Sequence, residues 1–371
     1  MSKPIVETYV YELTEADKIS IEKYGHRGNP DIGYPIMEGE RDPWLWPFSR
    51  TSIWNMPIGS EAKYADIGFT PSIEFCMDGC YMLTTKEDDE YLDILGSGMG
   101  ARWPDDVSKL QSPGKTYWPR DLTISKDSFM NDCSTILQPD KRHYVQMQPT
   151  CRHEKGSSYV IGFAKYKPSI LYDIYENGEL GSHWGSGLSA IGGTIRLGEL
   201  FSDEPIRHAL KLNVWADKWL YWDEKERGYI WPADRSDTKP EKHADNPYLM
   251  EGSLVAIPRD LTPEEVGITC PIVKKMFVCL QDYGAYIVDD TVRDSYSLSI
   301  DYAAQQEVLE KTGITMRGFF DRLPNEETRE YGTDFVKMIC CLKVITNNGP
   351  DSIGGGGIPC QPLAPDLPKI K

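Results

Sequence analysis

The sequence predicts a mainly β protein, similar to a β-sandwich or jelly roll, with a few short helices. Short apolar runs of strand length recur along the chain, and turn-forming Gly, Asp, Asn and Pro residues separate them. Long helical patterns are few, which favours a sandwich or jelly roll. Hydrophobic residues make up 40% and charged residues 26% of the chain, a balance typical of a globular protein with a sizeable core.

The chain divides into an N-terminal arm, a β-rich body and a tail. Residues 1–50 are polar and interrupted by Gly and Pro, so we expect an extended arm that wraps the body. Residues 51–349 form the expected single β-rich domain, with a possible boundary between two subdomains near residue 155. Residues 350–371 are rich in Gly and Pro, and we expect a loop or tail there.

Strands are predicted where short apolar runs lie between turn signals. The clearest case is the run in which Leu210, Leu212 and Val214 alternate with Lys211 and Asn213, the period-two pattern of a half-buried strand. The full set of predicted strands is 158–166, 170–175, 194–197, 208–215, 252–257, 285–288 and 335–345.

Helices are predicted at three places. The sequence Thr-Pro-Glu-Glu from Thr262 supplies an N-cap, a Pro at the first helical position and a capping box completed by Glu265. A second start at Pro271 precedes apolar residues at helical spacing, and Gly284 stands where a left-handed C-cap would lie. A third helix is expected at 300–311, which is rich in Ala, Gln, Glu and Leu.

The charge balance excludes several classes of partner. With 57 acidic and 40 basic side chains the formal charge is −17, which would repel nucleic acid and anionic lipid, so neither is expected to bind. No run approaches the roughly 18–20 apolar residues of a membrane span. The N-terminus does not resemble a signal peptide, which leaves an intracellular protein, a removed signal or another export route as alternatives.

The nine cysteines and six histidines do not predict a metal site or a bound cofactor. The histidines are scattered, and no second Cys or His pair lies at zinc-finger spacing. An odd number of cysteines in a chain of this length argues against a disulfide framework. One pair, Cys76 and Cys80, could still close a small loop across the turn that Met-Asp-Gly predicts. The oligomeric state is left open.

Several motifs in the middle of the chain resemble a family of bacterial, often secreted, proteins that carries no assigned chemistry. The motifs are Gly-Ser-Gly-Leu-Ser at 185–189, Gly-Gly-Thr-Ile-Arg-Leu-Gly-Glu at 192–199, Ile-Arg-His-Ala-Leu at 206–210, Trp-Pro-Ala at 231–233 and Tyr-Gly-Ala-Tyr-Ile-Val-Asp-Asp at 283–290. This resemblance implies a β-sandwich-like bacterial or viral protein exposed to the environment, and hence extracellular action. It implies no particular reaction.

Aromatic residues suggest a carbohydrate partner. The chain has 10 Trp and 21 Tyr, and flat apolar rings with a polar group suit sugar-binding surfaces, so we expect a polysaccharide or oligosaccharide to bind. Trp184 and Trp231 each lie beside Gly or Pro, a placement typical of exposed loops, and we expect them to stack on sugars. His183 shares the Gly-rich loop 181–187 with Trp184, where glycines allow a ligand to approach the backbone closely.

The predicted function is hydrolysis of glycosidic bonds in an extended polysaccharide. That reaction uses two carboxyl groups, one ionised and one protonated. Glu199, His208 and Asp289 form the predicted acid–base group: Arg196 could hold Glu199 ionised and help bind substrate, His208 begins an alternating strand, and Asp289 ends one.

Two alternatives remain open at this stage. A polysaccharide lyase would use His208 with Tyr283, a tyrosine also expected to contact substrate, and a basic patch of Arg152, Arg196 and Arg207. A non-catalytic carbohydrate-binding protein, or a structural protein of a virion or cell envelope, would use the same aromatic residues without perturbed carboxyl groups. Each candidate also has a structural explanation, such as an ion pair between Glu199 and Arg196 or a buried, hydrogen-bonded His208.

Overall fold

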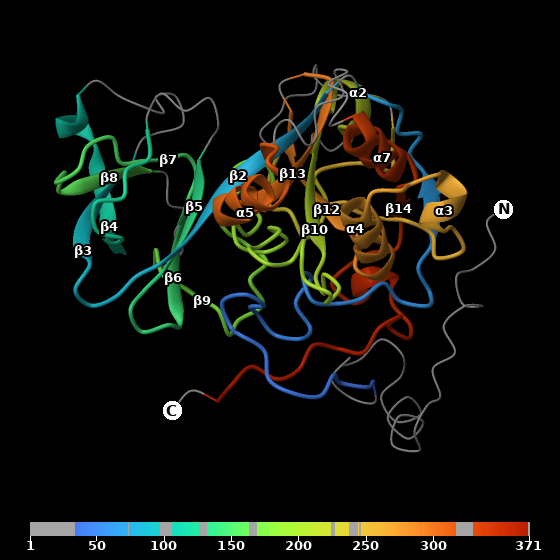
Figure 1. Ribbon diagram of the computed structural model, residues 1–371, viewed down its shortest axis with the longest axis horizontal. Helices are drawn as coiled ribbons and strands as arrows, with labels where there is room; N and C mark the ends of the chain where they lie inside the picture. The colour runs from blue at the N-terminus through green and yellow to red at the C-terminus, as the bar shows by residue number, and fades with distance from the viewer. Residues whose placement is uncertain are drawn as a thin grey trace.

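Figure 1 shows a computed structural model of the chain, in which a large sheet lies beside a smaller one. The structure describes residues 34–72, 74–96, 106–125, 132–162, 169–223, 227–236, 244, 246–291, 293–316 and 329–369. Most of the arm predicted at residues 1–50 and His243 lie outside the described residues.

The large sheet is mixed and has ten strands in the described part of the chain. The central strands β10 and β12 pair in parallel, as do β13, β2 and β5, while β10 and β13 pair antiparallel. In spatial order the strands are β1 (Tyr64–Asp66), β14 (Lys343–Ile345), β11 (Leu254–Ala256), β12 (Ala285–Asp290), β10 (Leu210–Val214), β13 (Ser295–Asp301), β2 (Glu74–Thr84), β5 (Cys133–Leu137), β6 (His143–Met147) and β9 (Tyr172–Asp173).

The smaller sheet packs beside the β5–β6 end of the large one (Figure 1). Its core contains Leu92, Trp118 and Val160 together with Ile136 and Val145 of the large sheet. Its strands, in spatial order, are β4 (Gln111–Trp118), β3 (Glu90–Gly96), β8 (Tyr159–Gly162) and β7 (Thr150–Cys151).

Helices cover one face of the large sheet. Phe277 of α4, Val308 of α5 and Ile339 of α7 share a buried cluster with Leu212 and Leu298 of the central strands. The helices are α2 (Ala216–Trp219), α3 (Pro263–Val266), α4 (Pro271–Asp282), α5 (Tyr302–Thr312) and α7 (Arg329–Cys340), and two short 3₁₀ turns are η2 (Val107–Lys109) and η4 (Ile353–Gly355).

The opposite face of the sheet is covered by irregular segments, and we call it the helix-free face. Trp54 and Leu188, from two such segments, pack there against Tyr286 and Val288 of β12. Successive residues of a strand point to opposite faces, and Leu210, Leu212 and Val214 of β10 pack on the helix side. Lys211 and Asn213 therefore point to the helix-free face.

The mainly β class with a few helices is confirmed, because 30% of the described residues lie in strands and 16% in helices. The capping box on α3 is confirmed as well: the Thr262 hydroxyl accepts from the N–H of Glu265, and the Glu265 carboxylate accepts from Thr262. The predicted strand at 335–345 is wrong in its first half, where α7 continues to Cys340 before β14. At 194–197 only Ile195 forms an isolated bridge.

Two further observations concern cysteines and membranes. All nine cysteines are free, and the predicted loop closure between Cys76 and Cys80 is wrong because both residues lie within the continuous strand β2. None of the described helices has the length and apolar character needed to cross a bilayer.

Candidate functional site

Two polar sites lie near each other on the protein. The first, which we call the arm hollow, is a cavity of about 570 Å³ between the segment 37–46 and the segment 196–208. Its lining residues are Met37, Glu38, Glu40, Arg41, Asp42, Leu45, Trp46, Arg196, Leu197, Gly198, Glu199, Ser202, Glu204, Pro205, Arg207, His208 and Pro365. The second, which we call the His183 cluster, consists of His183, Asp78, Asp289, Lys211 and Asn213 on the helix-free face.

Glu199 and His208 are in direct contact in the wall of the arm hollow. The Nε2 atom of His208 lies 2.9 Å from Oε1 of Glu199, and its Nδ1 lies 2.9 Å from the carbonyl of Ala209. Both ring nitrogens of His208 therefore face acceptor atoms. The backbone N–H of Arg196 donates to Oε2 of Glu199 over 2.7 Å. The Glu199 side chain is 21% exposed, so it reaches the cavity.

The Glu199 carboxylate is held in its charged form. Burial alone would raise the pKa of Glu199, but the charge and hydrogen bond of His208 and the charge of Arg196 outweigh burial and hold this pKa below its usual value. An ionised carboxylate at the wall of a cavity can act as a base.

Arg196 is buried, and two of its nitrogen atoms lack a hydrogen-bond partner among the described residues. Its Nη2 donates to the carbonyl of Ile191 over 3.1 Å, while Nη1 lies 3.8 Å from Glu199. Its Nε and Nη1 atoms have no hydrogen-bond partner among the described residues, although Arg196 is only 2% exposed. Unmet guanidinium donors beside a cavity can bind a carboxylate or hydroxyl group of a ligand.

The backbone around Glu199 is fixed from three sides. Ile195 forms a parallel bridge to Ile300 of β13, so the segment begins on the sheet. The N–H of Gly198 donates to Glu307 of α5 over 2.9 Å, and Lys275 of α4 donates to the carbonyl of Glu199 over 2.5 Å. The segment therefore presents Glu199 on a rigid support, although it is not itself a strand.

The His183 cluster gathers side chains from neighbouring central strands. Asp78 of β2 stands opposite Ser299 of β13, and Asn213 of β10 stands opposite Asp289 of β12. The Oγ of Ser299 lies 3.3 Å from Oδ2 of Asp78. His183 reaches this row from the loop 181–187: its Nε2 lies 3.0 Å from Asp78 and its Nδ1 lies 3.3 Å from Asp289.

The His183 ring is a buried cation between two carboxylates. Burial alone would lower the pKa of His183, but its contacts with Asp289 and Asp78 outweigh burial and raise the pKa to about 9. Burial would raise the pKa of Asp78, yet the hydrogen bond and charge of His183, with Lys211 and Asn213, lower it overall. The Lys211 ammonium donates to the carbonyl of Ala190 over 2.7 Å, and burial lowers its pKa.

Glycines let the His183 loop lie directly on the sheet. A Cβ atom on Gly185 would stand 2.5 Å from Oδ1 of Asp289, and one on Gly187 would stand 2.1 Å from Oδ1 of Asp234. Gly187 also has φ +75°, a conformation that glycine adopts without strain. The glycines that the sequence shows around His183 are therefore explained by close approach of two carboxylates to the backbone.

The sequence-predicted residues fall into both sites. Glu199, His208 and Arg196 meet at the arm hollow, and His183 and Asp289 meet in the His183 cluster beside Trp184. Trp231 packs against the apolar cluster of the helix-free face, and Tyr283 is buried in it.

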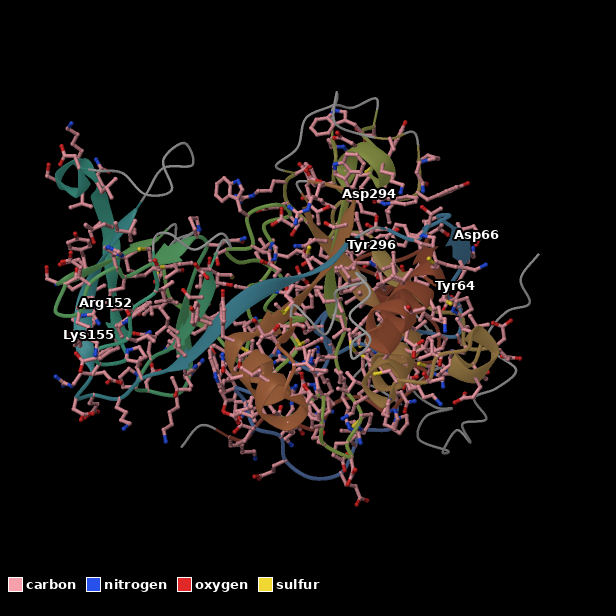
Figure 2. The ribbon with its side chains drawn as sticks, turned by 45° about the horizontal axis from the view of Figure 1, so that its top comes forward. Tyr64, Asp66, Arg152, Lys155, Asp294 and Tyr296 are labelled. Atoms are coloured by element: carbon pink, nitrogen blue, oxygen red, sulfur yellow. The ribbon has the colours of Figure 1, made fainter. Side chains whose placement is uncertain are left out.

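The predicted arginine patch is divided between two parts of the molecule. Arg196 and Arg207 both line the arm hollow. Arg152 lies in the part of the molecule that holds the smaller sheet (Figure 2), where it forms an ion pair of 2.7 Å with Glu90 of β3.

Sequence reasoning missed Asp78, Asn213 and Lys211 as site residues. Asp78 was hidden because Asp-Gly was interpreted as a turn. The signal that could have found it is the alternation of Phe75 and Met77 with polar neighbours. No three His, Cys, Asp or Glu side chains converge into a potential metal site in the described ranges. Comparison with protein-family models, curated proteins and solved structures finds no significant match to the chain.

Proposed function

We propose that the chain is a carbohydrate-active enzyme that cleaves an extended polysaccharide in the arm hollow, with Glu199 as its base. The observation that carries this proposal is the ionised Glu199, bonded to His208, at the wall of a cavity of about 570 Å³. This volume lies within the roughly 300–1,000 Å³ of small-molecule sites. Trp46, half-buried in the same wall, offers an aromatic surface for a sugar ring.

Hydrolysis is the first candidate reaction. Glu199 would accept a proton from water as the water oxygen attacks the anomeric carbon, and a carboxylic acid on the other side of the cavity would protonate the leaving oxygen. The arm segment supplies two such carboxyl groups, Glu38 and Glu40, to the lining. Both are exposed before substrate binds, so substrate itself would have to bury the acid.

Elimination on a uronate-containing polymer is the second candidate, and Arg196 favours it. The guanidinium groups of Arg196 and Arg207 both line the arm hollow and match the carboxylate of a uronate. Glu199 would then remove the proton next to that carboxylate, and the glycosidic oxygen would leave with a proton taken from water as the ring double bond forms. Elimination is favoured when the base, here Glu199, is held close to a substrate whose carboxylate is fixed in position.

The test is a panel of purified neutral and uronate-containing polysaccharides, read in parallel for new reducing ends and for ultraviolet absorbance of unsaturated uronates. Glu199→Gln should lower turnover about 10²–10⁴-fold, the usual contribution of a positioned base. Glu204→Gln is the matched control, because Glu204 lines the same cavity but its side chain is 78% exposed. It should retain turnover within about threefold.

The two readouts separate the candidate reactions. Reducing ends without ultraviolet absorbance would establish hydrolysis, and both signals together would establish elimination. The proposal would be contradicted if the wild-type protein gave neither signal on any polysaccharide of the panel, or if Glu199→Gln were fully active. Either result would leave a carbohydrate-binding or structural protein as the better account.

A further inference from the structure

The outer face of the smaller sheet carries three tyrosines, one from each of the strands β3, β4 and β8. The inward residues of these strands belong to a buried cluster, and they include Leu92, Trp118 and Val160. Successive residues of a strand point to opposite faces of a sheet. Tyr91, Tyr117 and Tyr159 each adjoin one of these buried residues, so all three point outward, and we call this surface the tyrosine face.

The tyrosine face is open to solvent at its centre. β3 lies between β4 and β8 in the sheet, so Tyr91 stands in the middle of the surface. Tyr91 is nevertheless 56% exposed, while Tyr117 and Tyr159 are half-buried at its sides. A partner in solution can therefore reach the Tyr91 ring directly, without any movement of the fold.

Strand register gathers an ion pair beside the tyrosines. Tyr91 stands opposite Tyr117, and their ring centroids lie 4.8 Å apart with the ring planes inclined at 47°. Two residues further along β3, Asp93 lies between Lys115 of β4 and Tyr159 of β8. The Lys115 ammonium donates to Oδ2 of Asp93 over 3.1 Å. The five side chains thus form one continuous surface that is three strands wide.

The chemical character of the tyrosine face suits a sugar chain. Tyrosine rings offer an apolar surface to the C–H groups of a sugar ring, and their hydroxyl groups can donate and accept hydrogen bonds. The Lys115 and Asp93 side chains are 46% and 42% exposed, so they can donate to and accept from sugar hydroxyls. Their charges cancel within the pair, so a ligand would be held by its ring faces and hydroxyls rather than by net charge.

The size of the tyrosine face argues against a protein partner, including a second copy of this chain. Neighbouring strands lie about 4.8 Å apart and alternate residues about 6.8 Å apart, so the five side chains span only about 10 Å by 7 Å between their centres. A stable protein interface covers about 800 Å² on each partner, and charged residues are depleted at its core. A narrow polymer chain needs no such area and leaves the ion pair hydrated.

We propose that the tyrosine face is a surface binding site for a polysaccharide chain, which lies across Tyr91 and Tyr117 and exchanges hydrogen bonds with Asp93 and Lys115. The smaller sheet lies at the end of the molecule opposite α3 (Figure 1), and none of these residues lines the arm hollow. The inference rests on the proposed function for its class of ligand, but it requires no bond cleavage. The site would hold one part of a polymer while another part occupies the arm hollow.

The test is calorimetric binding of soluble glucan, xylan, mannan, galactan and a uronate polymer to the full chain, with Glu199→Gln present throughout to prevent cleavage. At least one polymer should bind. Adding Tyr91→Ala or Tyr117→Ala should weaken that binding about tenfold, as expected for the loss of one aromatic contact. Tyr91→Phe keeps the ring and should bind within about threefold. Tyr248→Ala is the matched control, because Tyr248 is 52% exposed and lies outside the smaller sheet.

Several results would overturn the proposal. They are absence of binding by every polymer, equal loss in Tyr248→Ala, or undiminished binding in both alanine variants. Affinity should change less than about threefold between about 0.05 M and about 0.5 M salt, and a steep loss would mean that charge, not the rings, holds the polymer. A smaller sedimenting species in Tyr91→Ala than in the wild type would assign the face to a second copy of this chain.

Failure of the catalytic proposal would be seen separately. With Glu199 intact, Tyr91→Ala should turn over a short oligosaccharide of the cleaved polymer at the wild-type rate, because Tyr91 does not line the arm hollow. Loss of that turnover would overturn the separation of the two sites. Binding that depends on Tyr91, in a protein that cleaves no polymer, would support the tyrosine face and contradict only the catalytic role of Glu199.

Discussion

At the scale of single residues, His183 and His208 each contact a carboxylate, but they lie in different parts of the chain. His208 lies two residues before β10, whose alternating pattern indicated the orientation of this segment, so its burial against a carboxylate could be predicted from sequence. His183 lies in an irregular loop, and nothing local indicates that two carboxylates from β2 and β12 meet its ring. That contact depends on how strands far apart in the sequence are arranged in the sheet, and the local sequence pattern does not show this arrangement.

The raised pKa of His183 predicts a loss of stability in alkaline solution. Because the folded pKa of about 9 lies above the ordinary value of 6.5, the contacts of His183 stabilise the fold fully below pH 6.5. This contribution disappears as the pH rises through 9, and its size is on the order of 3 kcal/mol. Urea unfolding at pH 6 and at pH 9.5 should show that His183→Gln lowers stability at pH 6 and has a smaller effect at pH 9.5.

Burial lowers the pKa of Lys211, and Lys211 is present in both the wild type and the variant. An equal pH dependence of unfolding in the wild type and in His183→Gln would contradict the assignment of the imidazolium to His183.

At the scale of elements, local chemistry predicted some segments and tertiary packing decided others. The α3 helix was predictable because its capping box is encoded within four residues. The start of 335–345 was not, because a short buried apolar run fits both a strand and a helix. In β2 the Asp-Gly pair suggested a turn, yet Gly79 is required in a strand because the Tyr302 ring would stand 2.7 Å from a Cβ there. That misinterpretation hid Asp78, one of the five residues of the His183 cluster.

The Gly-rich loop that carries His183 should not tolerate a side chain at Gly185. In Gly185→Ala the new Cβ would stand 2.5 Å from Asp289 Oδ1 and 2.7 Å from the carbonyl of Val288, so the loop must lift from β12. We expect a loss of about 1–3 kcal/mol in the free energy of unfolding, the usual cost of overpacking. Chemical denaturation of the variant measures it.

Gly349→Ala is the control, because a Cβ at Gly349 would meet only Ser352 Oγ at an ordinary 3.5 Å. If both variants unfold like the wild type, the close approach of Asp289 to the loop backbone does not exist in solution. The His183 imidazole resonances should change in Gly185→Ala alone.

At the scale of the whole molecule, segments from near the two ends of the chain build one wall of the arm hollow together. Leu363 is fully buried with Tyr34 and Met56, and its backbone N–H donates to the carbonyl of Pro35 over 2.8 Å. Met37 and Pro365, which flank this contact, both line the cavity. The sequence showed only Gly- and Pro-rich segments here, because the few apolar residues in each segment form no periodic pattern.

Removing the Leu363 side chain should therefore loosen the cavity as well as the fold. Leu363→Ala creates a void under the arm, and we expect the free energy of unfolding to fall by about 2–5 kcal/mol, as for other buried leucines. Leu171→Ala, at a residue that is 44% exposed, is the matched control and should change stability by less than about 1 kcal/mol.

Limited proteolysis should cut Leu363→Ala first near residues 34–46, because the contact with Leu363 holds that segment in place. Cleavage there at the wild-type rate would mean that the arm is held by its other contacts, such as the hydrogen bond that Trp46 Nε1 donates to Asn55 Oδ1. The cavity would then survive in Leu363→Ala, and any turnover in the arm hollow would survive with it.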